Sequence, residues 1–380
     1  MLISAACSEI TIKGGNRRAF ESLLIRNIRS ALGGASSLKV SRHAGRLLIS
    51  ADGIAKEDAL DALRKTFGID HVYFPDSCRP EIGEIEKAVI PFSGGLAGKY
   101  IRVETKRSDK GFPVPSQEVN RIIGSTLVGR GARVDLESPE KTIYIDILPG
   151  RALVYMEKFR CEGGLPVGSS GKLLSLLSGG IDSPVATWMM MRRGCTADLF
   201  HLHSQQSNGD VFGSKIIRIA EALGKYSPKK LRLTTAPYHE FYKKSLGMDP
   251  RIELVLFRRF LFHLSNELAA RDGYKGVVTG DSVGQVASQT TENIFASDEA
   301  CSIPVFRPLA GFNKQEIIDT AVRIGTYGIS IEQYKDCCSL VAQKKPSTRA
   351  RLDAVRAAEA LLDIPSLVRR TLEQSETLEP

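Results

Sequence analysis

The chain has 380 residues, of which 42% are hydrophobic and 25% are charged, and this balance excludes a disordered or fibrous protein. Charged residues and glycines interrupt every apolar run before it reaches the roughly 18 residues of a membrane helix. The N-terminus has neither the basic start nor the apolar stretch of a secretory signal. The seven cysteines argue for a reducing compartment, since an odd number does not form a disulfide framework. We expect a cytoplasmic protein of two or three domains that does not bind membranes.

The net charge is +9 at pH 7, from 52 basic and 43 acidic residues, and the excess is spread along the whole chain. An anionic partner that contacts every part of the chain would explain this spread, and nucleic acid is the first candidate. A mildly basic enzyme without such a partner is the alternative, and charge alone does not separate the two.

The N-terminal residues predict a small α/β unit. Apolar residues at helical spacing predict a helix over 16–32, and a second amphipathic pattern predicts one over 56–68. Strands are expected at 46–51 and 72–75. A βαββαβ order of these elements would form a ferredoxin-like unit.

A second α/β pattern follows. Alternation of side chains predicts a strand over 99–107, and a helix is expected over 116–130 with Ser116 as its N-cap. Residues 132–148 predict two strands around a Ser-Pro turn. The stretch 161–172, rich in Gly, Ser and Pro, is typical of a linker.

From Leu173 onwards, apolar strands alternate with glycine turns and long helices. Such alternation predicts a doubly wound parallel sheet with helices on both faces. The expected strands are 173–177, 197–203, 230–236 and 276–280, and the expected helices are 183–193, 213–224 and 251–270.

The loop SGGIDS (178–183) lies between the first of these strands and its helix. Ligands of such sheets collect at the carboxyl ends of the strands, where a turn and a helix N-terminus present amide groups to an anion. Gly179 and Gly180 permit close backbone approach, and Ser178 and Ser183 supply hydroxyl donors. The loop therefore predicts a phosphate site, with an unliganded turn as the alternative.

Asp182 sets this loop apart from the P-loop of NTPases, which needs a Gly-Lys-[Ser/Thr] ending. Its carboxylate would repel phosphate unless Mg²⁺ lay between them. A loop of this kind suits a pyrophosphate group that leaves with its metal, and hence a reaction at the α-phosphorus in which AMP is transferred.

The loop resembles the PP-loop of the ATP pyrophosphatase superfamily, and the whole chain resembles the tRNA 4-thiouridine synthetases. The family pattern is matched by SEITIKGGNRRAFESLLIRNI near the start, by VETKRSDKGFPVPSQEVN and by GGLPVGSSGK before the loop. It continues in TGDSVGQVASQT (279–290), RPLAGFNKQEII (307–318) and IGTYGISIEQYKDCC (324–338).

This resemblance implies a protein of mixed α/β and α+β class with three domains. A ferredoxin-like domain is expected over 1–78 and a THUMP domain, which binds RNA, over 79–165. A catalytic PP-loop domain of the adenine nucleotide alpha hydrolase type is expected over 166–380.

The resemblance also implies an ATP-dependent sulfurtransferase that acts on uridine 8 of tRNA. In that family the C4 oxygen attacks the α-phosphorus of ATP, pyrophosphate leaves, and sulfur displaces AMP to give 4-thiouridine. ATP and Mg²⁺ are the implied cofactors, with the metal held through Asp182. The expected ATP and pyrophosphate site comprises Leu177, Ser178, Gly179, Gly180, Ile181, Asp182, Ser183, His203, Arg259, Gly280, Gln285, Ser288 and Gln289.

Three basic residues, Lys106, Arg107 and Lys110, are the candidates for tRNA binding in the THUMP match. Basic side chains beside an aromatic one, here Phe112, suit an RNA backbone and a stacked base. A charged edge strand with a turn is the alternative. Arg307, which matches a family position, is a further candidate for phosphate or tRNA.

Two other polar pairs have competing interpretations. Arg258 and Arg259 lie together on an expected helix, where they either neutralise phosphate or stay solvated; Arg259 is the one assigned to the nucleotide site. Asn313 followed by Glu316 is typical of a helix capping box rather than of catalysis.

A sulfur carrier needs a thiolate that can hold a persulfide. The active cysteine of the family matches the second of the pair in KDCCSL, so Cys338 is expected to carry sulfur, with Cys337 as the alternative. An iron–sulfur cluster held by one of this pair and Cys301 stays open, whereas the lack of C-x-x-C spacing argues against zinc. The other cysteines are expected to be inert: Cys7, Cys78, Cys161, Cys195 and Cys301.

The chain departs from the family pattern at two points. After the second strand it has HSQQSNGD (203–210) where many members have SPPYTS, so substrate contacts there are uncertain. It carries no rhodanese domain, so sulfur is expected from a separate donor, either a cysteine desulfurase persulfide or free sulfide. A role in forming the thiamine thiazole is therefore less expected, and a homodimer is expected by family analogy alone.

Two other functions remain as alternatives. One is an adenylating enzyme with a different nucleophile, such as an amidating PP-loop enzyme, which would not need Cys338. The other is a tRNA-binding protein without catalysis, against which the intact SGG-x-D-S loop argues.

Overall fold

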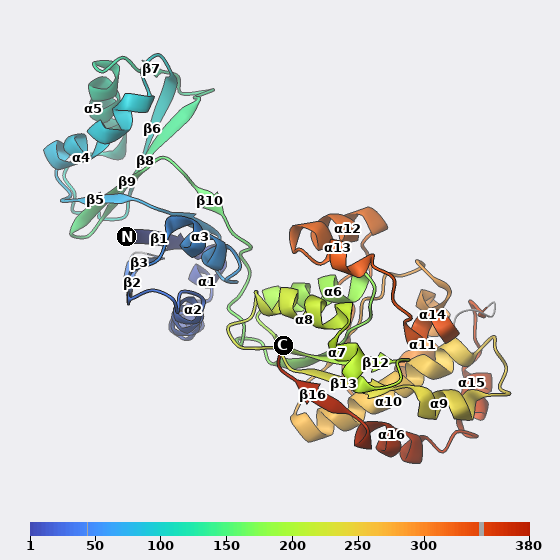
Figure 1. Cartoon of the computed structure of the whole chain (residues 1–380). Coiled ribbons are helices and arrows are strands. Elements are labelled where there is room, and N and C mark those ends of the chain that lie inside the picture. The colour runs from blue at the N-terminus through green and yellow to red at the C-terminus, as the bar shows by residue number, and fades with distance from the viewer. Residues whose placement is uncertain (44, 342–345) are drawn as a thin grey trace. The chain divides into compact units, whose positions relative to one another are not determined.

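The computed structural model describes residues 1–43, 45–341 and 346–380. Their contacts divide the chain into two compact units, Met1–Gly164 and Leu165–Pro380, each with hydrophobic cores of its own (Figure 1). Within the described residues, the first unit contains two five-stranded sheets and the second a six-stranded sheet.

The first sheet has the strand order β10-β4-β1-β3-β2, and its strands pair in antiparallel fashion. Leu24 and Ile28 of one helix and Leu63 of another are buried with Ile3 and Ile49 of the sheet. The expected βαββαβ order is confirmed, because apolar spacing along a helix is a local property of the sequence. The elements are β1 (Leu2–Ala6), α1 (Ser8–Thr11), α2 (Arg17–Ala31), β2 (Ser37–His43), β3 (Arg46–Asp52), α3 (Lys56–Arg64), β4 (His71–Tyr73) and β10 (Phe159–Arg160).

The second sheet has the order β5-β9-β8-β6-β7 and mixes parallel and antiparallel pairs. Val119, Ile123 and Leu127 point from α5 into its core. Ser116 is the first helical residue and not the N-cap, because Pro115 holds the extended capping conformation. The elements are β5 (Asp76–Cys78), α4 (Ile82–Val89), β6 (Tyr100–Arg107), α5 (Ser116–Val128), β7 (Arg133–Val134), β8 (Lys141–Leu148) and β9 (Arg151–Tyr155).

Short strands link the two sheets of this unit. Strand β5 precedes the boundary expected after residue 78, yet it pairs with β9 of the second sheet. Strand β10 follows the second sheet and returns to pair with β4 of the first. The domain limits at residues 78 and 165 stay predictions.

The second unit is built on a sheet of order β15-β14-β11-β12-β13-β16, parallel except for the edge strand β16. The strand order reverses at β11, which lies between β12 and β14. In doubly wound sheets the ligand crevice opens at this switch point, beyond the carboxyl ends of the strands. The strands are β11 (Lys172–Leu176), β12 (Thr196–His203), β13 (Leu233–Pro237), β14 (Val277–Val278), β15 (Val305–Phe306) and β16 (Glu376–Leu378).

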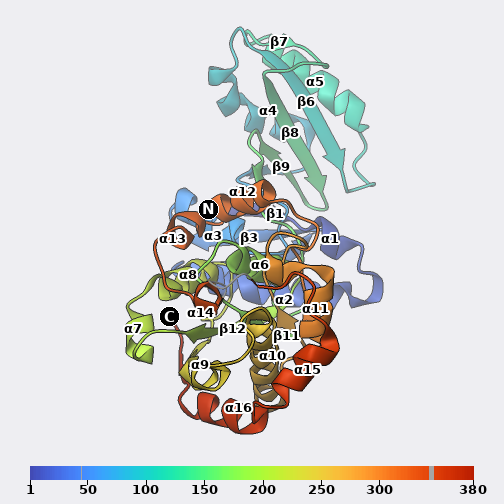
Figure 2. The same cartoon turned by 90° about the vertical axis from the view of Figure 1, so that its right-hand side faces the viewer.

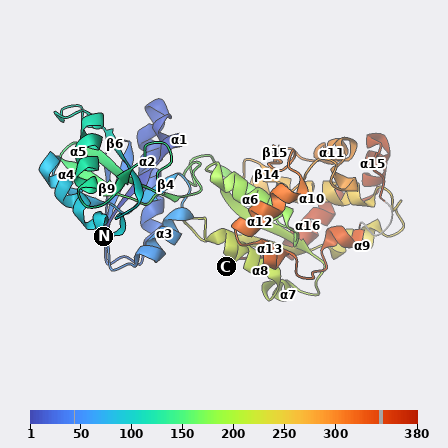
Figure 3. The ribbon, with the colours of Figure 1, turned by 90° about the horizontal axis from the view of Figure 1, so that it is seen from above.

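Helices cover both faces of this sheet, as Figure 1, Figure 2 and Figure 3 show. Helices α6, α8, α12 and α13 lie on one face, and α9, α10 and α16 lie on the other. The predicted doubly wound architecture is thereby confirmed. The helices are α6 (Asp182–Arg192), α7 (Asn208–Phe212), α8 (Lys215–Gly224), α9 (His239–Ser245), α10 (Glu253–Asp272), α11 (Thr291–Asp298), α12 (Lys314–Arg323), α13 (Tyr327–Ser330), α14 (Cys337–Val341), α15 (Leu352–Glu359) and α16 (Ile364–Glu373).

The core of the second unit depends on helix α10, which packs on β11 and β12 through aromatic residues. Phe260 is fully buried and stacks on Phe241, with ring centroids 5.1 Å apart. No helix among the described residues has the length and apolarity to cross a bilayer.

We expect Phe260→Ala to lower the free energy of unfolding of the second unit by about 3–5 kcal/mol, because it leaves a cavity in a packed core. Trp188 is the single tryptophan of the chain and is buried in this unit, so its fluorescence during urea unfolding reports the change. Phe295→Ala is the matched control, since Phe295 is exposed. Equal effects of the two substitutions would contradict this account of the core.

Candidate active site

The loop SGGIDS joins β11 to α6 at the switch point of the sheet. Two of its amides are bound by hydroxyl groups of the loop itself: Ser178 N donates to Ser183 Oγ (2.8 Å), and Gly180 N donates to Ser178 Oγ (3.3 Å). The amide of Gly179 donates to a carboxylate oxygen of Asp336, 3.1 Å away. A turn that leads directly into a helix N-terminus concentrates donors that suit an anion.

Asp182, the first residue of α6, is held from two sides. Its Oδ1 accepts a hydrogen bond from Lys314 Nζ (2.7 Å), and its Oδ2 accepts one from Gln285 Nε2 (3.0 Å). Lys314 is the first residue of α12, directly after the N-cap residue Asn313, and the predicted capping box of Asn313 and Glu316 is confirmed. No local sequence pattern marks Lys314 as a site residue, because the carboxylate that it binds lies 132 residues away in the chain.

A cavity of about 240 Å³ lies beside the loop. Apolar side chains from both layers of the domain, including Phe200, Leu202 and Phe257, form part of its wall. Such a mixture of apolar walls and a polar loop suits a ligand with a flat base and a charged tail. Of the expected nucleotide-site residues, the structure places Leu177, Ser178, Gly180, Asp182, Ser183, Gly280, Ser288 and Gln289 in the lining.

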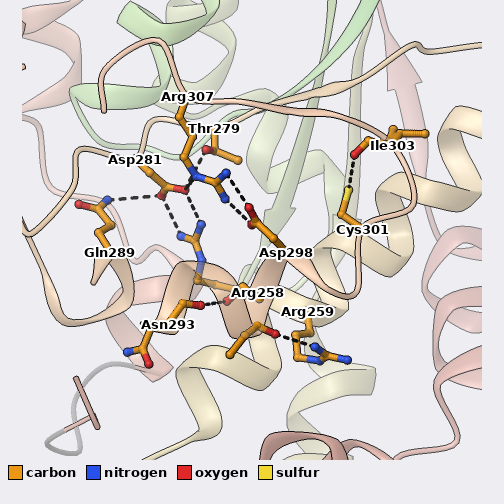
Figure 4. Close-up of polar contacts among 12 residues, drawn as sticks. Arg258, Arg259, Thr279, Asp281, Gln289, Asn293, Asp298, Cys301, Ile303 and Arg307 are labelled. Carbon is orange, nitrogen blue, oxygen red and sulfur yellow. Dashed lines mark hydrogen bonds and ion pairs between the residues drawn. The ribbon is translucent and has the colours of Figure 1, made fainter. Parts of the chain in front are cut away.

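A buried carboxylate, Asp281, organises the polar wall of the cavity (Figure 4). It accepts hydrogen bonds from Nη1 and Nη2 of Arg258 (3.0 and 2.6 Å) and from Arg307 Nε (3.0 Å). Burial opposes ionisation of Asp281, but the charges of Arg258 and Arg307 outweigh it and hold the pKa of this carboxyl below its usual value. Arg258 is therefore the helix arginine that lines the cavity.

Gly280 brings the segment after β14 against the start of α6. A Cβ atom at this position would lie 2.7 Å from Ser183 N and 2.9 Å from the carbonyl carbon of Asp182. Since those neighbours are backbone atoms, only glycine permits the approach. The same segment carries Gln285, which reaches Asp182, and Gln289, whose Nε2 points to Asp281 (3.5 Å).

Arg259 does not reach the cavity, so its assignment to the nucleotide site is corrected. It is only 3% exposed and forms ion pairs with Glu299 and Glu359, and its Nη1 donates to the carbonyl oxygen of Ala296. Consecutive helical residues point about 100° apart. The direction that brings Arg258 to the cavity therefore turns Arg259 toward α11 and α15.

Three further candidates are also absent from the cavity lining. His203 is buried, with its Nε2 paired with Asn208 Oδ1 at 2.8 Å, and it is absent from the cavity lining. Arg307 is bound to Asp281 and to Asp298, so it holds the polar wall of the site in place, and its contact with phosphate or tRNA stays a prediction. Ile181 is the N-cap residue of α6 and is also absent from the lining.

The cysteine segment packs directly on this site. Cys337, the first residue of α14, is 1% exposed, and its thiol donates to the carbonyl oxygen of Leu202 (3.3 Å). Cys338 lies in α14, but its side chain is outside the described part of the structure. Burial raises the pKa of the Cys301 thiol. Among the described residues no group of three or more His, Cys, Asp or Glu is arranged to hold a metal ion.

The tRNA candidates of the first unit separate into two kinds. Lys106 and Lys110 are exposed, and Lys106 borders a polar cavity of about 620 Å³ that Arg17 also lines. Arg107 instead donates to the carbonyl oxygen of Phe112 (2.8 Å) and holds the turn after β6. Phe112 is buried in the core, so the expectation that it stacks on a base is wrong.

The fold and the loop together define a class of protein. A PP-loop-like turn at the switch point of a parallel sheet, with Gly280 and Asp182 beside a cavity, is the framework of a nucleotide-binding α/β domain.

Family models place the chain more narrowly. The model described as "Thiamine biosynthesis protein (ThiI)" matches residues 168–364, the ThiI ferredoxin-like domain matches 2–72, and the THUMP domain matches 91–157. The chain belongs to the ThiI family, and the predicted ferredoxin-like, THUMP and parallel-sheet architecture is confirmed.

Related proteins are similar in sequence to this chain over nearly its full length. A probable tRNA sulfurtransferase of Caldanaerobacter subterraneus is 36% identical over 363 residues, which are 95% of each chain. One from Thermus thermophilus is 37% identical over 380 residues, 100% of this chain and 93% of that one. A solved 4-thiouridine synthetase–RNA complex with bound ATP has 32% identity and a TM-score of 0.88, and covers 99% of this chain and 98% of that one.

Gly280→Ala is expected to weaken ATP binding at least tenfold, because its Cβ would push the segment after β14 away from α6. Isothermal titration with Mg-ATP measures the change. Gly328→Ala is the control, since a Cβ at Gly328 meets nothing within 4 Å. Unchanged affinity in both variants would mean that the Gly280 contact does not shape the nucleotide site.

The ionisation of Glu359 tests whether Arg259 is held in ion pairs away from the cavity. Burial favours its protonated form, but hydrogen bonds from His263 and Arg259 outweigh burial and lower its pKa to about 2. Its contribution to stability is therefore present above the unfolded pKa near 4.5 and is lost as pH falls toward 2. This loss is on the order of 3 kcal/mol.

We expect Glu359→Gln to remove this part of the acid sensitivity, so that urea midpoints followed through Trp188 fall less between pH 5 and pH 3 than in the wild type. Asp353→Asn, at an exposed ion pair with Arg351, should change the acid sensitivity far less, because solvent screens this pair. If Glu359→Gln keeps the full acid sensitivity, Glu359 is not bound to Arg259 in solution.

Proposed function

We propose that the chain is an ATP-dependent tRNA sulfurtransferase that adenylates uridine 8 of tRNA and replaces its O4 by sulfur, giving 4-thiouridine. The observation that carries this function is the SGG-x-D-S loop at the start of α6. Lys314 binds its aspartate, Gly280 packs against its backbone, and a cavity lies beside it. Full-length similarity to a 4-thiouridine synthetase with bound ATP and RNA supports it.

In this proposal the loop binds the pyrophosphate part of ATP. The amides of Gly179 and Gly180, the hydroxyls of Ser178 and Ser183 and the N-terminus of α6 supply donors for its oxygens. Asp182 fits Mg²⁺, because its carboxylate lies at the loop and carboxylate oxygens are preferred ligands of this ion. When bound, Mg²⁺ neutralises charge on the departing pyrophosphate.

Lys314 supplies the cation that the loop itself lacks. Its ammonium group is 2.7 Å from Asp182, so it lies beside the pyrophosphate position rather than in the loop. A positive charge there stabilises the negative charge that develops as pyrophosphate leaves. The buried cluster around Asp281 holds the segment that carries Gly280, Ser288 and Gln289, which would face nucleotide or uridine.

Sulfur delivery is assigned to Cys338. The terminal sulfur of its persulfide would bond to C4 of the adenylated uridine as the bond from C4 to the AMP oxygen breaks, and a second thiol would cleave the sulfur–sulfur bond. A cysteine desulfurase, as a separate partner, would pass the outer sulfur of its own persulfide to the Cys338 thiol. Free sulfide as the donor would instead attack C4 directly as AMP leaves, with no persulfide on the protein. Lys106 and Lys110 of the first unit would contact tRNA phosphates, and the protein would act as a homodimer.

Pyrophosphate release tests the first half of the reaction. Purified protein with Mg-ATP and an unmodified tRNA transcript should release pyrophosphate, and a transcript with a different base at position 8 should not support release. Release that ignores both the tRNA and that base would show that the loop serves another substrate.

Cys338→Ser is expected to abolish 4-thiouridine formation, because the thiol assigned to carry sulfur is gone, while tRNA-dependent pyrophosphate release continues. Absorbance of the thiolated base measures the first activity. Cys301→Ser is the matched control and should keep both activities, since the Cys301 thiol is bound to the Ile303 carbonyl. Thiolation that survives in Cys338→Ser would remove this residue from the mechanism and favour Cys337 or free sulfide in its place.

A further inference from the structure

Three amides of the loop are occupied by groups of the protein, but the three acceptors differ in kind. Ser178 N and Gly180 N donate to serine hydroxyls inside the loop. Gly179 N donates to a carboxylate from a distant segment, Asp336 Oδ2, at 3.1 Å. A carboxylate oxygen and a phosphate oxygen are both anionic acceptors, so Asp336 holds a position that the proposed pyrophosphate requires.

Asp336 immediately precedes the cysteine pair. Its backbone forms an isolated β-bridge with His203 at the end of β12. The next residue, Cys337, begins α14, is almost fully buried and is bound to the carbonyl oxygen of Leu202. The contact with Gly179 thus ties the start of the cysteine helix to the phosphate loop.

The residues before Asp336 are fixed independently of the loop amides. Lys215 Nζ donates to the carbonyl oxygens of Ser330 (2.7 Å) and Glu332 (2.6 Å). Tyr334 Oη pairs with His201 Nε2 at 2.9 Å. Because these contacts hold the approach to Asp336, loss of its contact with Gly179 would be felt mainly from Asp336 onward, in α14.

A single amide hydrogen does not serve two anions at once. When pyrophosphate enters the loop, the Asp336 carboxylate would face like charge at close range in a partly buried site, and this repulsion favours its departure. Departure of the carboxylate removes the contact that ties the residue before Cys337 to the phosphate loop.

We propose that Asp336 is a positioning residue that competes with pyrophosphate for the Gly179 amide and so makes exposure of the cysteine helix depend on nucleotide binding. This inference rests on the proposed role of the loop in ATP binding. The order it imposes is nucleotide binding first and release of the start of the cysteine helix second.

The affinity for pyrophosphate shows whether the Asp336 carboxylate competes with pyrophosphate or helps to bind it. Asp336→Ala should bind Mg-pyrophosphate about tenfold more tightly than the wild type in isothermal titration, because the internal competitor is gone. Asp336→Asn should lie between the two, since its amide oxygen still accepts from Gly179 but carries no charge. Asp353→Asn, at an exposed aspartate of α15, is the control and should not change the affinity. Weaker binding in both Asp336 variants would overturn the proposal, since a structural or metal-binding carboxylate predicts that result.

Thiol labelling tests the coupling to the cysteine helix. Alkylation of Cys337 by iodoacetamide, read by peptide mass spectrometry, should rise about tenfold when wild-type protein is saturated with Mg-pyrophosphate. In Asp336→Ala the rate should be high without ligand and should not rise further. The buried Cys195 serves as the internal reference, and its labelling should stay slow throughout.

The outcomes separate the two proposals. If pyrophosphate binds but Cys337 labelling does not rise, the coupling through Asp336 is overturned while the proposed function of the loop stands. If pyrophosphate does not bind at all, the phosphate role of the loop fails, and the competition proposed for Asp336 fails with it.

Discussion

The close approach of two backbone segments is the constraint on which the site depends. Gly280, after β14, lies against the amide of Ser183 at the start of α6, at a distance that excludes any side chain. This contact exists because β11 and β14 are neighbours in the sheet and both end at the same edge. It aligns the loop after one strand with the segment after the other, so that Gln285 reaches Asp182 and the cavity opens between them.

The arginines described near the site are each paired with carboxylates. Arg258 and Arg307 share Asp281, and Arg259 is divided between Glu299 and Glu359. Breaking such buried pairs leaves an uncompensated charge, so each arginine is committed to its partner. Lys314 differs, because it is about half exposed and its partner Asp182 lies at the phosphate loop itself. It is therefore the basic residue best placed to change partners when a nucleotide binds.

The cysteine segment shows how one interaction serves two purposes. Asp336 closes the loop through Gly179, and in the same conformation Cys337 is buried against Leu202. A thiol in this position is shielded from solvent. In the proposed order, Cys337 stays covered until a nucleotide enters the loop. The Asp336 contact can provide that cover only if it is reversible.

Several properties follow from the sequence by itself. The helix α2, the alternating strands of the second unit and the capping box of Asn313 arise from side-chain spacing along a few consecutive residues, and these predictions are confirmed. The SGGIDS loop is also recognisable from the sequence, since its glycines and serines lie close together.

No local pattern tells which neighbours a side chain faces in the folded domain. Several features depend on segments that are far apart in the chain. They are the choice between Arg258 and Arg259, the contact of Lys314 with Asp182, the burial of Phe112 and Cys337, and the hydrogen bond from Gly179 to Asp336. Only tertiary packing decides them, because adjacent residues of one element face different neighbours, and those neighbours are set by the order of strands in the sheet.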